Sequence, residues 1–487
     1  MLLAILSATA ISANLFFSAR QEEQTVFLIK PTEEQRLEAV QRFQAAGFRQ
    51  SRHNEVLFLS SMSVTDWDLI RIPDVPFSFG LNFASSEVTD EGLTILAGFR
   101  NLTVLNLLFT KVTCEGDRGF ERLENLTQLS LLGSPVTDAG INEIAKLRNL
   151  AMLDLRKTRV NGPGLEQLRG LQHLSTIEID LTDTSLRSLK IAGLLHTLPV
   201  AQGPDSSSVD SDDGIGVLNL DGFYGNQLTD AAIEELAHLP ALTTLTFVAS
   251  GITDAGLPGL AKVRNLTTLS LEQTKVTDAG LSELAGISNL ATLTLDRTAV
   301  TDAGIAHLRN IRNLTTLNLN RTAITDAGIR MVSRLHGLNA LSVESSSVTL
   351  SGVAEISNLK QLKSLNLKGS KVADVGLAQI AHLASLTSLD LILCEVTDAG
   401  LKHLRPLRDL KSLHLNRTLI TDTGLKELSS LTQLSTLSLN ATRITDNGLK
   451  ELSAIKRLRM LTLIGTLVTE AGIRELQKAL PECEILH

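Results

Sequence analysis

The sequence predicts an α/β solenoid of about 17 repeats of 24 residues, with a curved parallel sheet on the concave face and short helices on the convex face. From Leu266 the chain reads Leu-x-x-Leu-x-Leu-x-x-Thr-x-Val-Thr-Asp-Ala-Gly-Leu, and the pattern begins again at Leu290. Hydrophobic residues make up 43% of the 487 residues but aromatic residues only 3%. A core of Leu, Ile, Val and Ala suits thin, repeated layers.

The aspartate of this unit keeps the 24-residue interval over most of the chain. It stands at Asp230, Asp254, Asp278, Asp302, Asp326, Asp374, Asp398, Asp422 and Asp446, with Leu350 and Glu470 at the two remaining positions. Earlier copies are looser and place Asp66, Asp90, Cys114, Asp138 and Gly162 at the same step. So many copies in one phase make the pattern highly specific.

Each repeat is expected to supply one strand and one helix. Because side chains alternate along a strand, Leu269 and Leu271 should face the core while Thr268 and Ser270 face the concave side. The Thr-Asp-Ala-Gly-Leu segment carries a helix N-cap followed by apolar residues three apart, which indicates a short convex helix. Its glycine suggests a close approach between the backbones of adjacent coils.

In many repeats a hydroxyl residue lies four positions before the aspartate step, where the chain leaves the strand. Such a hydroxyl can satisfy a backbone group that the turn leaves unpaired, so we interpret these residues as structural. They are threonine at 274, 298, 322, 418, 442 and 466 and serine at 134, 250, 346 and 370, and Cys394 occupies the equivalent position in its repeat.

This pattern is the leucine-rich-repeat motif and covers roughly residues 55 to 480. The Val-Thr-Asp-Ala-Gly-Leu unit resembles the cysteine-containing class of these repeats, found in F-box substrate receptors and in many bacterial proteins, with Thr where that class often has Cys. The 24-residue period is shorter than is usual for that class, and the near-identical copies are more like the bacterial proteins. The resemblance implies protein binding and transfers no catalytic residue.

The two ends of the array need caps that cover the apolar layers. Residues 20–54 are the predicted amino-terminal cap, with a strand at 26–29 and a capping box at 32–35 that opens a helix ending near Gly47. Repeat arrays are expected at 55–198 and 228–472, and a carboxy-terminal cap at 473–487, in which Pro481 to Ile485 closes the stack.

The period breaks between the two arrays, at residues 199–227. Residues 199–216 are rich in Pro, Gly, Ser and Asp without a basic residue, which favours a mobile loop, and a long turn follows at 221–227. Loops that interrupt a rigid array are common places for function, although neutral insertion explains the segment equally well. Its carboxylates lack calcium-loop spacing, so we predict no metal site.

Net charge and cysteine content exclude several classes. The net charge of −8 and pI of about 5.8 argue against a general binder of nucleic acid or anionic membranes, while leaving room for a small basic patch. Cys114, Cys394 and Cys483 lack the spacing of a zinc site or a redox pair. No cofactor, disulfide or metal is therefore expected.

Residues 1–19 are the predicted signal peptide or amino-terminal membrane anchor. The run is apolar up to Phe17 and has small residues suited to cleavage, but it lacks the basic start of a signal peptide and is short for a membrane span. We expect an exported or membrane-anchored protein; a cytoplasmic one is the alternative.

One row of outward strand residues needs separate analysis as a site. Asn366, Asp390, His414 and Ser438 occupy one position in four successive repeats, so stacking should place them side by side. An Asp-His-Ser order is what nucleophilic acyl transfer requires. A flat strand surface offers no oxyanion hole or closed pocket, however. A polar recognition site or plain solvated surface is the preferred interpretation.

Two further groups are predicted to contact a partner. Arg297 and Arg321 follow successive strands and should be neighbours, more often as a solvated rim than as a phosphate site. Aromatic residues dominate binding hot spots, and none follows Phe247, so tight docking is expected in the first half. The expected anchors are Phe58, Phe223 and Tyr224, with Val104, Leu108 and Leu132 nearby.

The sequence thus predicts a non-enzymatic protein-binding scaffold that uses its concave face and the insertion at 199–227. The ligand is expected to be a protein and not a nucleic acid. Two alternatives stay open: a hydrolase that uses Asp390, His414 and Ser438, and a ubiquitin-ligase-type substrate adaptor, for which no F-box is visible.

Overall fold

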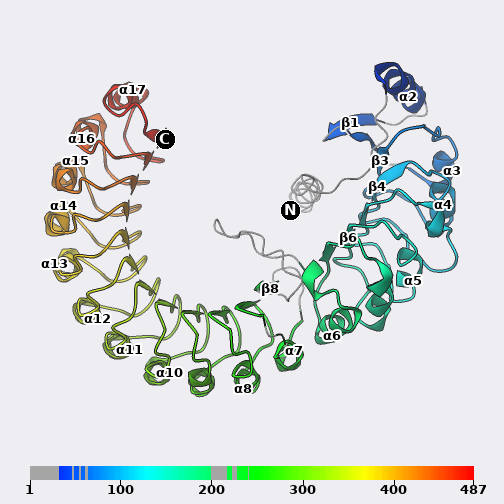
Figure 1. Cartoon of the computed structure of the whole chain (residues 1–487). Coiled ribbons are helices and arrows are strands. Elements are labelled where there is room, and N and C mark those ends of the chain that lie inside the picture. Colours follow the sequence, from blue (N-terminus) through cyan, green and yellow to red (C-terminus); the bar gives the residue numbers. More distant parts are fainter. Residues whose placement is uncertain are drawn as a thin grey trace. The chain divides into compact units, whose positions relative to one another are not determined.

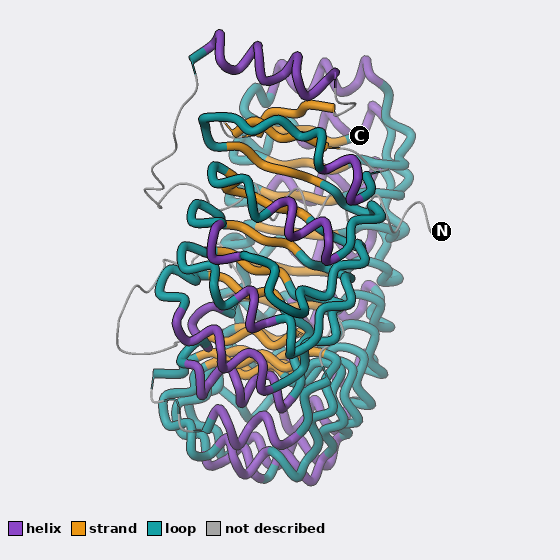
Figure 2. The backbone as a smooth tube through the Cα atoms, turned by 90° about the vertical axis from the view of Figure 1, so that its right-hand side faces the viewer, coloured by secondary structure: helices purple, strands orange, loops and turns teal. Residues whose placement is uncertain are grey.

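The computed structural model describes residues 32–45, 49–53, 56–60, 64–198, 217–221, 227–237, 239 and 241–487. The chain divides into two compact units, Met1–Val200 and Ala201–His487. In each unit, short helices lie behind a sheet of stacked strands (Figures 1 and 2). The predicted α/β leucine-rich-repeat solenoid is confirmed. The predicted mobile loop at 199–216 and the strand at 26–29 lie outside the described residues.

The first unit holds a seven-stranded sheet in the order β1 to β7. Its strands are β1 Arg49–His53, β2 Val56–Ser60, β3 Phe79–Asn82, β4 Leu102–Asn106, β5 Gln128–Ser130, β6 Met152–Asp154 and β7 Thr176–Glu178. Its helices are α2 Glu33–Ala45, α3 Asp66–Leu69, α4 Asp90–Leu96, α5 Ile141–Ile144 and α6 Asp183–Ala192, with 3-10 helices η1 Phe120–Arg122, η2 Pro163–Gly170 and η3 Leu195–Thr197.

The amino-terminal cap differs in one respect from its prediction. The capping box forms, since the Gln35 N–H donates to Thr32 Oγ1 at 3.2 Å and the Thr32 N–H donates to Gln35 Oε1 at 3.0 Å. Strand β1, which we did not predict, pairs antiparallel with β2 at the sheet edge. Its sequence, RQSRH, carries no apolar residue, so hydrophobic periodicity gave no sign of it.

The second unit holds a twelve-stranded parallel sheet in the order β8 to β19. Its strands are β8 Val217–Asp221, β9 Thr244–Val248, β10 Thr268–Ser270, β11 Thr292–Thr294, β12 Thr316–Asn318, β13 Ala340–Ser342, β14 Ser364–Asn366, β15 Ser388–Asp390, β16 Ser412–His414, β17 Thr436–Ser438, β18 Met460–Thr462 and β19 Glu484–Leu486. As predicted, the carboxy-terminal segment closes the stack, because β19 pairs with β18.

Helices of the second unit follow its strands one by one. They are α7 Asp230–Leu236, α8 Leu257–Leu260, α9 Asp278–Leu281, α10 Asp302–Leu308, α11 Asp326–Val332, α12 Leu350–Ile356, α13 Asp374–Ile380, α14 Asp398–Leu401, α15 Asp422–Leu425, α16 Asp446–Leu452 and α17 Glu470–Ala479, with 3-10 helices η5 Glu283–Gly286, η6 Lys402–Leu404 and η7 Lys426–Ser430.

The core follows the predicted strand phase. Leu269 and Leu271 are fully buried, while Thr268 and Ser270, which alternate with them, are partly exposed on the concave side. The predicted hydroxyl contact also forms: Thr274 Oγ1 donates to the Leu271 carbonyl at 2.7 Å. Ser250 is the exception, because its buried hydroxyl has no hydrogen-bond partner in the described structure.

The repeated aspartate joins neighbouring repeats, a role that the sequence did not reveal. Asp254 accepts two hydrogen bonds from Thr277 of the next repeat, from its N–H at 2.8 Å and from its hydroxyl at 2.6 Å. The glycine serves this contact, since a Cβ on Gly280 would overlap the Asp254 carboxylate and the Leu257 side chain. The expectation of a close approach between two backbones was therefore wrong at this position.

Shortly after most strands, one residue adopts a left-handed backbone. The position recurs every 24 residues, with φ of +55° at Arg297 and Arg321, +54° at Ala441 and +73° at Gly465. This conformation turns the chain from the sheet toward the helix layer and favours glycine, yet most repeats place another residue there.

Two of the looser repeats of the first unit, those with Cys114 and Gly162 at the aspartate position, have a 3-10 helix in place of the α-helix. Where Cys114 replaces the aspartate, the backbone is left-handed with φ of +58°, and only η1 follows. Pro163 similarly begins η2 in place of an α-helix.

The helices of the described part of the chain are too short or too polar for any of them to span a bilayer.

Candidate functional site

The candidate site is the concave surface of the second unit, here called the concave polar surface: the outward residues of β11 to β17 and the residues two and three positions after each of these strands. The strand register pairs Asn366 with Asp390, Asp390 with His414, and His414 with Ser438. These four side chains thus follow one line across four strands. Leu389 and Leu413, their inward neighbours, are fully buried and fix that orientation.

Hydrogen bonds do not connect this line as acyl transfer would require. His414 Nε2 lies 3.0 Å from the hydroxyl of Ser412, on its own strand. The Ser438 hydroxyl donates to Asn416 Oδ1 at 2.8 Å and lies 2.6 Å from Thr462 Oγ1. In the described structure, neither Asp390 nor Ser438 is hydrogen-bonded to the His414 ring, so the base is not aligned with a nucleophile.

Asp390 and Asn366 instead satisfy the backbone of their own repeats. Asp390 Oδ1 accepts the Ile392 N–H at 2.9 Å, and Asn366 Oδ1 accepts the Lys368 N–H at 2.9 Å. Burial raises the pKa of the Asp390 carboxyl, and the Ile392 N–H and His414 oppose that rise. Much of the polarity on this line therefore holds the turn after the strand.

In other repeats, the backbone N–H two residues after the strand donates to an Asn or Asp side chain of the preceding repeat. Asn416 Oδ1 accepts the Asn440 N–H at 2.8 Å, and Asn440 Oδ1 accepts the Ile464 N–H at 2.8 Å. Asp296 does the same for Asn320, whose side-chain amide also donates to Asp296 Oδ2 at 2.7 Å. Burial raises the pKa of Asp296, against the hydrogen bonds from Asn320. Some of the Asn and Asp residues on this polar surface thus form a structural ladder, that is, hydrogen bonds that Asp296, Asn416 and Asn440 accept from the next repeat.

A charged group lies on the same surface and is not explained by that ladder. Glu344 Oε1 lies 3.1 Å from Lys368 Nζ and 3.3 Å from Arg321 Nη2. The Arg321 side chain is half exposed, and Arg297, one repeat earlier, is exposed as well. These side chains present one carboxylate and three cations beside Asp296.

Three apolar residues expected beside the anchors of the first unit are not accessible. Val104, Leu108 and Leu132 are buried. Leu108 and Leu132 form a cluster with Ala84 and Phe109, because the Phe109 ring lies over Gly133, where a Cβ would overlap it. The expectation that these residues offer free apolar surface was wrong.

Three predicted contact residues remain predictions. Phe223 and Tyr224 lie outside the described residues, and only the backbone of Phe58, in β2, is described. Sequence analysis missed Trp67 on α3, whose side chain is 80% exposed, and Ile70 at the C-cap of α3, which is 61% exposed. Trp67 follows the repeated aspartate, at the step where other repeats carry exposed Ala, so the 24-residue phase alone would have placed it outward.

Charged residues of the first unit gather at the end of its sheet. Arg156 donates to both Asp154 oxygens, at 2.9 and 2.8 Å, and lies 2.6 Å from Glu178 Oε2. Burial raises the pKa of Glu178 to about 7, and the Asp154 charge adds to the rise while Arg156 opposes it. Two carboxylates thus share one guanidinium.

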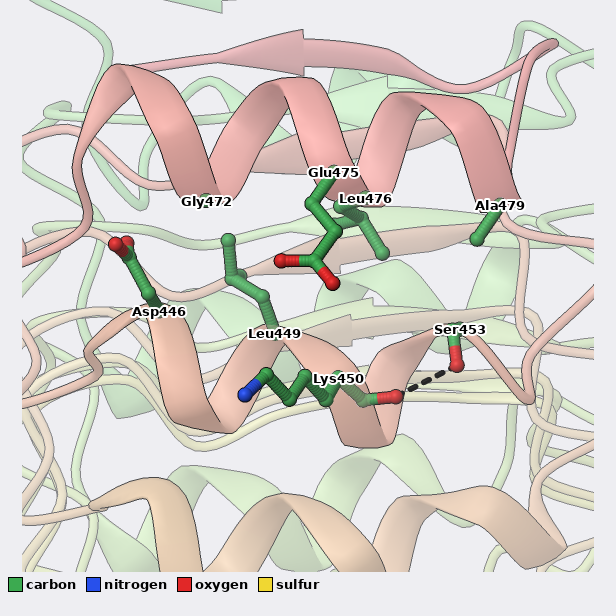
Figure 3. Close-up of a pocket in the computed structure, with 8 residues that line it drawn as sticks. All are labelled: Asp446, Leu449, Lys450, Ser453, Gly472, Glu475, Leu476 and Ala479. Atoms are coloured by element: carbon green, nitrogen blue, oxygen red, sulfur yellow. Dashed lines mark hydrogen bonds between the residues drawn. The ribbon is translucent and has the colours of Figure 1, made fainter.

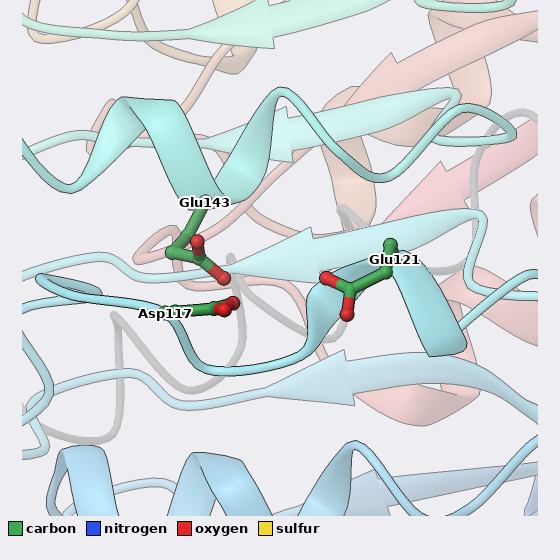
Figure 4. A group of neighbouring side chains, drawn as sticks. All are labelled: Asp117, Glu121 and Glu143. Carbon is green, nitrogen blue, oxygen red and sulfur yellow. The ribbon is translucent and has the colours of Figure 1, made fainter.

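An acidic cluster in the first unit superficially resembles a metal site. Asp117, Glu121 and Glu143 bring one oxygen each into a common region (Figure 4). The ammonium of Lys146 occupies it, at 2.9 Å from Asp117, 3.6 Å from Glu121 and 2.5 Å from Glu143. The three carboxylates are therefore already neutralised in part by a cation of the chain itself.

A hollow between α16 and α17 lies on the helix layer (Figure 3). Lys450 and Glu475 line it with Leu449 and Leu476. It is open, and its polar groups have opposite charges without convergent donors or acceptors, so its geometry suits no particular ligand.

Comparisons with known proteins agree with this architecture. A family model described as Leucine Rich repeat matches residues 264–285, 310–333 and 382–404. None of the curated protein sequences matches the chain. The crystal structure of a TLR13–ssRNA13 complex is similar with a TM-score of 0.53 and 16% identity, over 90% of this chain and 67% of that one.

Two bacterial structures are also similar. An internalin (InlF) of Listeria monocytogenes has a TM-score of 0.37 and 21% identity, covering 77% of this chain and 88% of its own. A leucine-rich-repeat protein of Leptospira interrogans has a TM-score of 0.42 and 19% identity, covering 84% and 89%. The repeat motif, the family match over three segments and the stacked parallel strands agree with a leucine-rich-repeat solenoid.

Proposed function

We propose that this chain is a non-enzymatic scaffold that binds a protein ligand on the concave polar surface. The observation that carries the proposal is the group formed by Arg321, Glu344 and Lys368. Its residues lie in the turns directly after β12, β13 and β14, and the group faces the same side as the line through Asp390, His414 and Ser438. Side-chain amides fix these turns, because the Glu344 N–H donates to Asn320 Oδ1 at 2.7 Å and the Lys368 N–H donates to Asn366 Oδ1 at 2.9 Å. Charged groups whose backbone is held in this way keep their geometry, which favours specific recognition.

The mixed charge of the surface favours a folded protein partner with complementary charges over a uniformly charged polymer. Arg297 and Arg321 supply cations at the rim, while Glu344 and Asp390 supply acceptors. Complementary charges of both signs fix the register of a partner and speed its association. Phe58, Phe223 and Tyr224 remain proposed anchors from the sequence alone.

The alternatives have less support. The hydrolase would need the Ser438 hydroxyl to donate to His414, but that hydroxyl donates to Asn416. For the ubiquitin-ligase-type adaptor, the only support is the resemblance of the repeat to the F-box class. Export or amino-terminal anchoring is likewise proposed from residues 1–19 alone.

The test of the proposal is partner capture by purified full-length protein, quantified by mass spectrometry. The concave variant carries Arg321→Ala, Lys368→Ala and His414→Ala. We expect its capture of the ligand to fall at least ~10-fold, because truncating a few central contacts removes most of the binding energy of an interface.

A matched control variant keeps the count of removed side chains but changes the turns and the helix layer. It carries Lys275→Ala, Lys371→Ala and Arg330→Ala. Capture should stay near the wild-type level with this control, and both variants should keep the wild-type melting temperature. Equal capture by both variants, or loss with both, contradicts the proposal; ester hydrolysis that disappears with His414→Ala alone would support the hydrolase instead.

A further inference from the structure

The two edges of the sheet in the second unit carry different charge. Each repeat crosses one edge on its way from the end of a helix to the next strand, and the other edge on its way from the strand to the next helix. The crossings from helix to strand are nine segments of seven residues, which recur every 24 residues from 261–267 to 453–459. They hold thirteen Lys or Arg and one acidic residue, Asp409. We call this side the basic edge.

The opposite edge has the reverse balance. The nine matching segments from 271–278 to 463–470 hold seven Lys or Arg and twelve Asp or Glu. Because the chain as a whole has a net charge of −8, the cations of the basic edge are a local concentration and not a reflection of average composition.

The cations of the basic edge are available to a partner. All thirteen are exposed. Arg405 pairs with Glu427 and Arg459 with Glu482, and the other eleven make no ion pair within the part of the chain that the structure describes. Hydrogen bonds between successive segments keep the row in order: the Asn289 side chain donates to the Arg264 carbonyl and that of Asn313 to the Ser288 carbonyl, at 2.9 and 2.8 Å.

The spacing of the row makes its charges act together. Strands of a sheet lie about 4.8 Å apart, so nine segments extend over roughly 40 Å. Six of the nine segments carry the cations, and successive charged segments are one or two strand spacings apart, about 5 to 10 Å, which is comparable with the Debye length of about 8 to 10 Å at physiological salt. An extended anionic surface therefore meets a continuous positive field and not separate point charges.

The geometry of the row favours a plane over a rod. In Figure 1 the helices α10 to α17 are seen nearly end-on along a curved path. The segments that follow these helices therefore all lie on the same side of the plane in which the second unit curves. A flat surface meets the whole row, whereas a straight duplex meets only part of a curved one. Binding of single-stranded nucleic acid usually uses stacking on aromatic rings, and the chain has no Phe, Tyr or Trp after Phe247.

We propose that the basic edge of the second unit docks on an anionic phospholipid surface. The contact is electrostatic, because the row holds flexible Lys and Arg side chains without apolar residues to insert. It lies on the edge of the sheet, so the concave polar surface stays free for a protein ligand.

The experiment measures sedimentation of the full-length protein with vesicles of phosphatidylcholine alone or with 30% phosphatidylglycerol (about one lipid in three, a common anionic fraction). Binding is expected only to the anionic vesicles at low salt, and it should weaken steeply as salt rises. An apolar leader that inserted into the bilayer would bind both kinds of vesicle. A vesicle-bound fraction that ignores salt, or that is equal on both vesicles, overturns the proposal.

The decisive variant carries Arg312→Gln, Lys360→Gln and Arg408→Gln. Partitioning should fall roughly 10- to 100-fold, since each basic residue near an anionic surface contributes on the order of 1 kcal/mol. A second variant, with Arg264→Gln, Lys363→Gln and Lys411→Gln, should give the same loss. Two independent sets keep the test valid if one of them impairs folding.

The matched control removes the same charge from the opposite edge, as Lys275→Gln, Lys371→Gln and Arg443→Gln. Its partitioning should stay within about twofold of the wild type, because these cations face away from the docked surface. Equal loss with the control would reduce the effect to net charge and overturn the proposal. Tight binding of duplex DNA without vesicle binding would also overturn it and assign the edge to nucleic acid.

Discussion

Asp398 holds Thr421 of the next repeat through two hydrogen bonds, from the threonine N–H to Oδ1 at 2.8 Å and from its hydroxyl to Oδ2 at 2.6 Å. The same hydroxyl accepts the Thr423 N–H at the start of α15, so one carboxylate orders the cap of the following helix. We expect Asp398→Ala to lower the free energy of unfolding by about 1 to 3 kcal/mol, the cost of leaving such groups unpaired. Urea denaturation measures this, and the exposed Asp409→Ala should change it little.

Gly424 makes room for that carboxylate, so its replacement should conflict with Asp398. A Cβ on Gly424 would overlap Asp398 Oδ1, and its backbone is not left-handed, so space and not conformation requires glycine. Gly424→Ala should therefore destabilise the protein by about 1 to 3 kcal/mol, as overpacking does. The double variant with Asp398→Ala should lose less than the sum of the two single losses. Fully additive losses would show that the two positions do not meet, and Gly170→Ala, which has open space, is the neutral control.

The strand phase predicts opposite behaviour for two adjacent residues of β12. Leu317 is fully buried, whereas Thr316 is partly exposed on the concave side. Leu317→Ala should cost roughly 2 to 5 kcal/mol through lost burial and the cavity left behind, and Thr316→Ala should cost little. Thermal or urea denaturation of the two variants decides between them; equal losses are incompatible with the described strand.

The left-handed position after β17 should gain stability from glycine. Ala441 is exposed there with φ of +54°, and the next repeat already has Gly465 at the same step. Ala441→Gly relieves the clash of Cβ with the backbone, and we expect about 0.5 to 1 kcal/mol of stabilisation after the entropy cost of glycine. Ala399→Gly, in the first turn of α14, is the control and should lower stability by a similar amount. A loss at both positions would contradict the described turn.

Glu178 makes the first unit sensitive to pH. Its pKa is raised from the ordinary 4.5 to about 7, so folding favours the protonated form. That stabilisation is complete below pH 4.5 and is lost as pH rises through 7. The Glu178 side chain is 20% exposed, so we expect a loss of about 1 to 3 kcal/mol between pH 5 and 8. Glu178→Gln should abolish this loss in urea denaturation, whereas the exposed Glu124→Gln should leave the pH profile unchanged.

The repeat, its phase and the residues that face the core follow from the amino-acid pattern alone. Leu269 and Leu271 are inward and Thr268 is outward because a strand alternates strictly, and a 24-residue period admits no other phase. The same rule placed Asp390 beside His414 and His414 beside Ser438. These neighbours follow from the 24-residue periodicity, which can be read directly from the sequence.

The roles of these neighbouring side chains depend on contacts that appear only in the folded chain. The His414 ring contacts Ser412 and the Ser438 hydroxyl contacts Asn416, and the repeat pattern does not show which of several nearby polar groups a side chain takes as its hydrogen-bond partner. The contact between the aspartate of one repeat and the glycine of the next is visible only when the two repeats are stacked, because Asp398 and Gly424 are 26 residues apart in the chain. Leu108 became buried through Phe109 lying across Gly133. Periodicity fixes the face on which a side chain stands, whereas packing between repeats fixes its contacts.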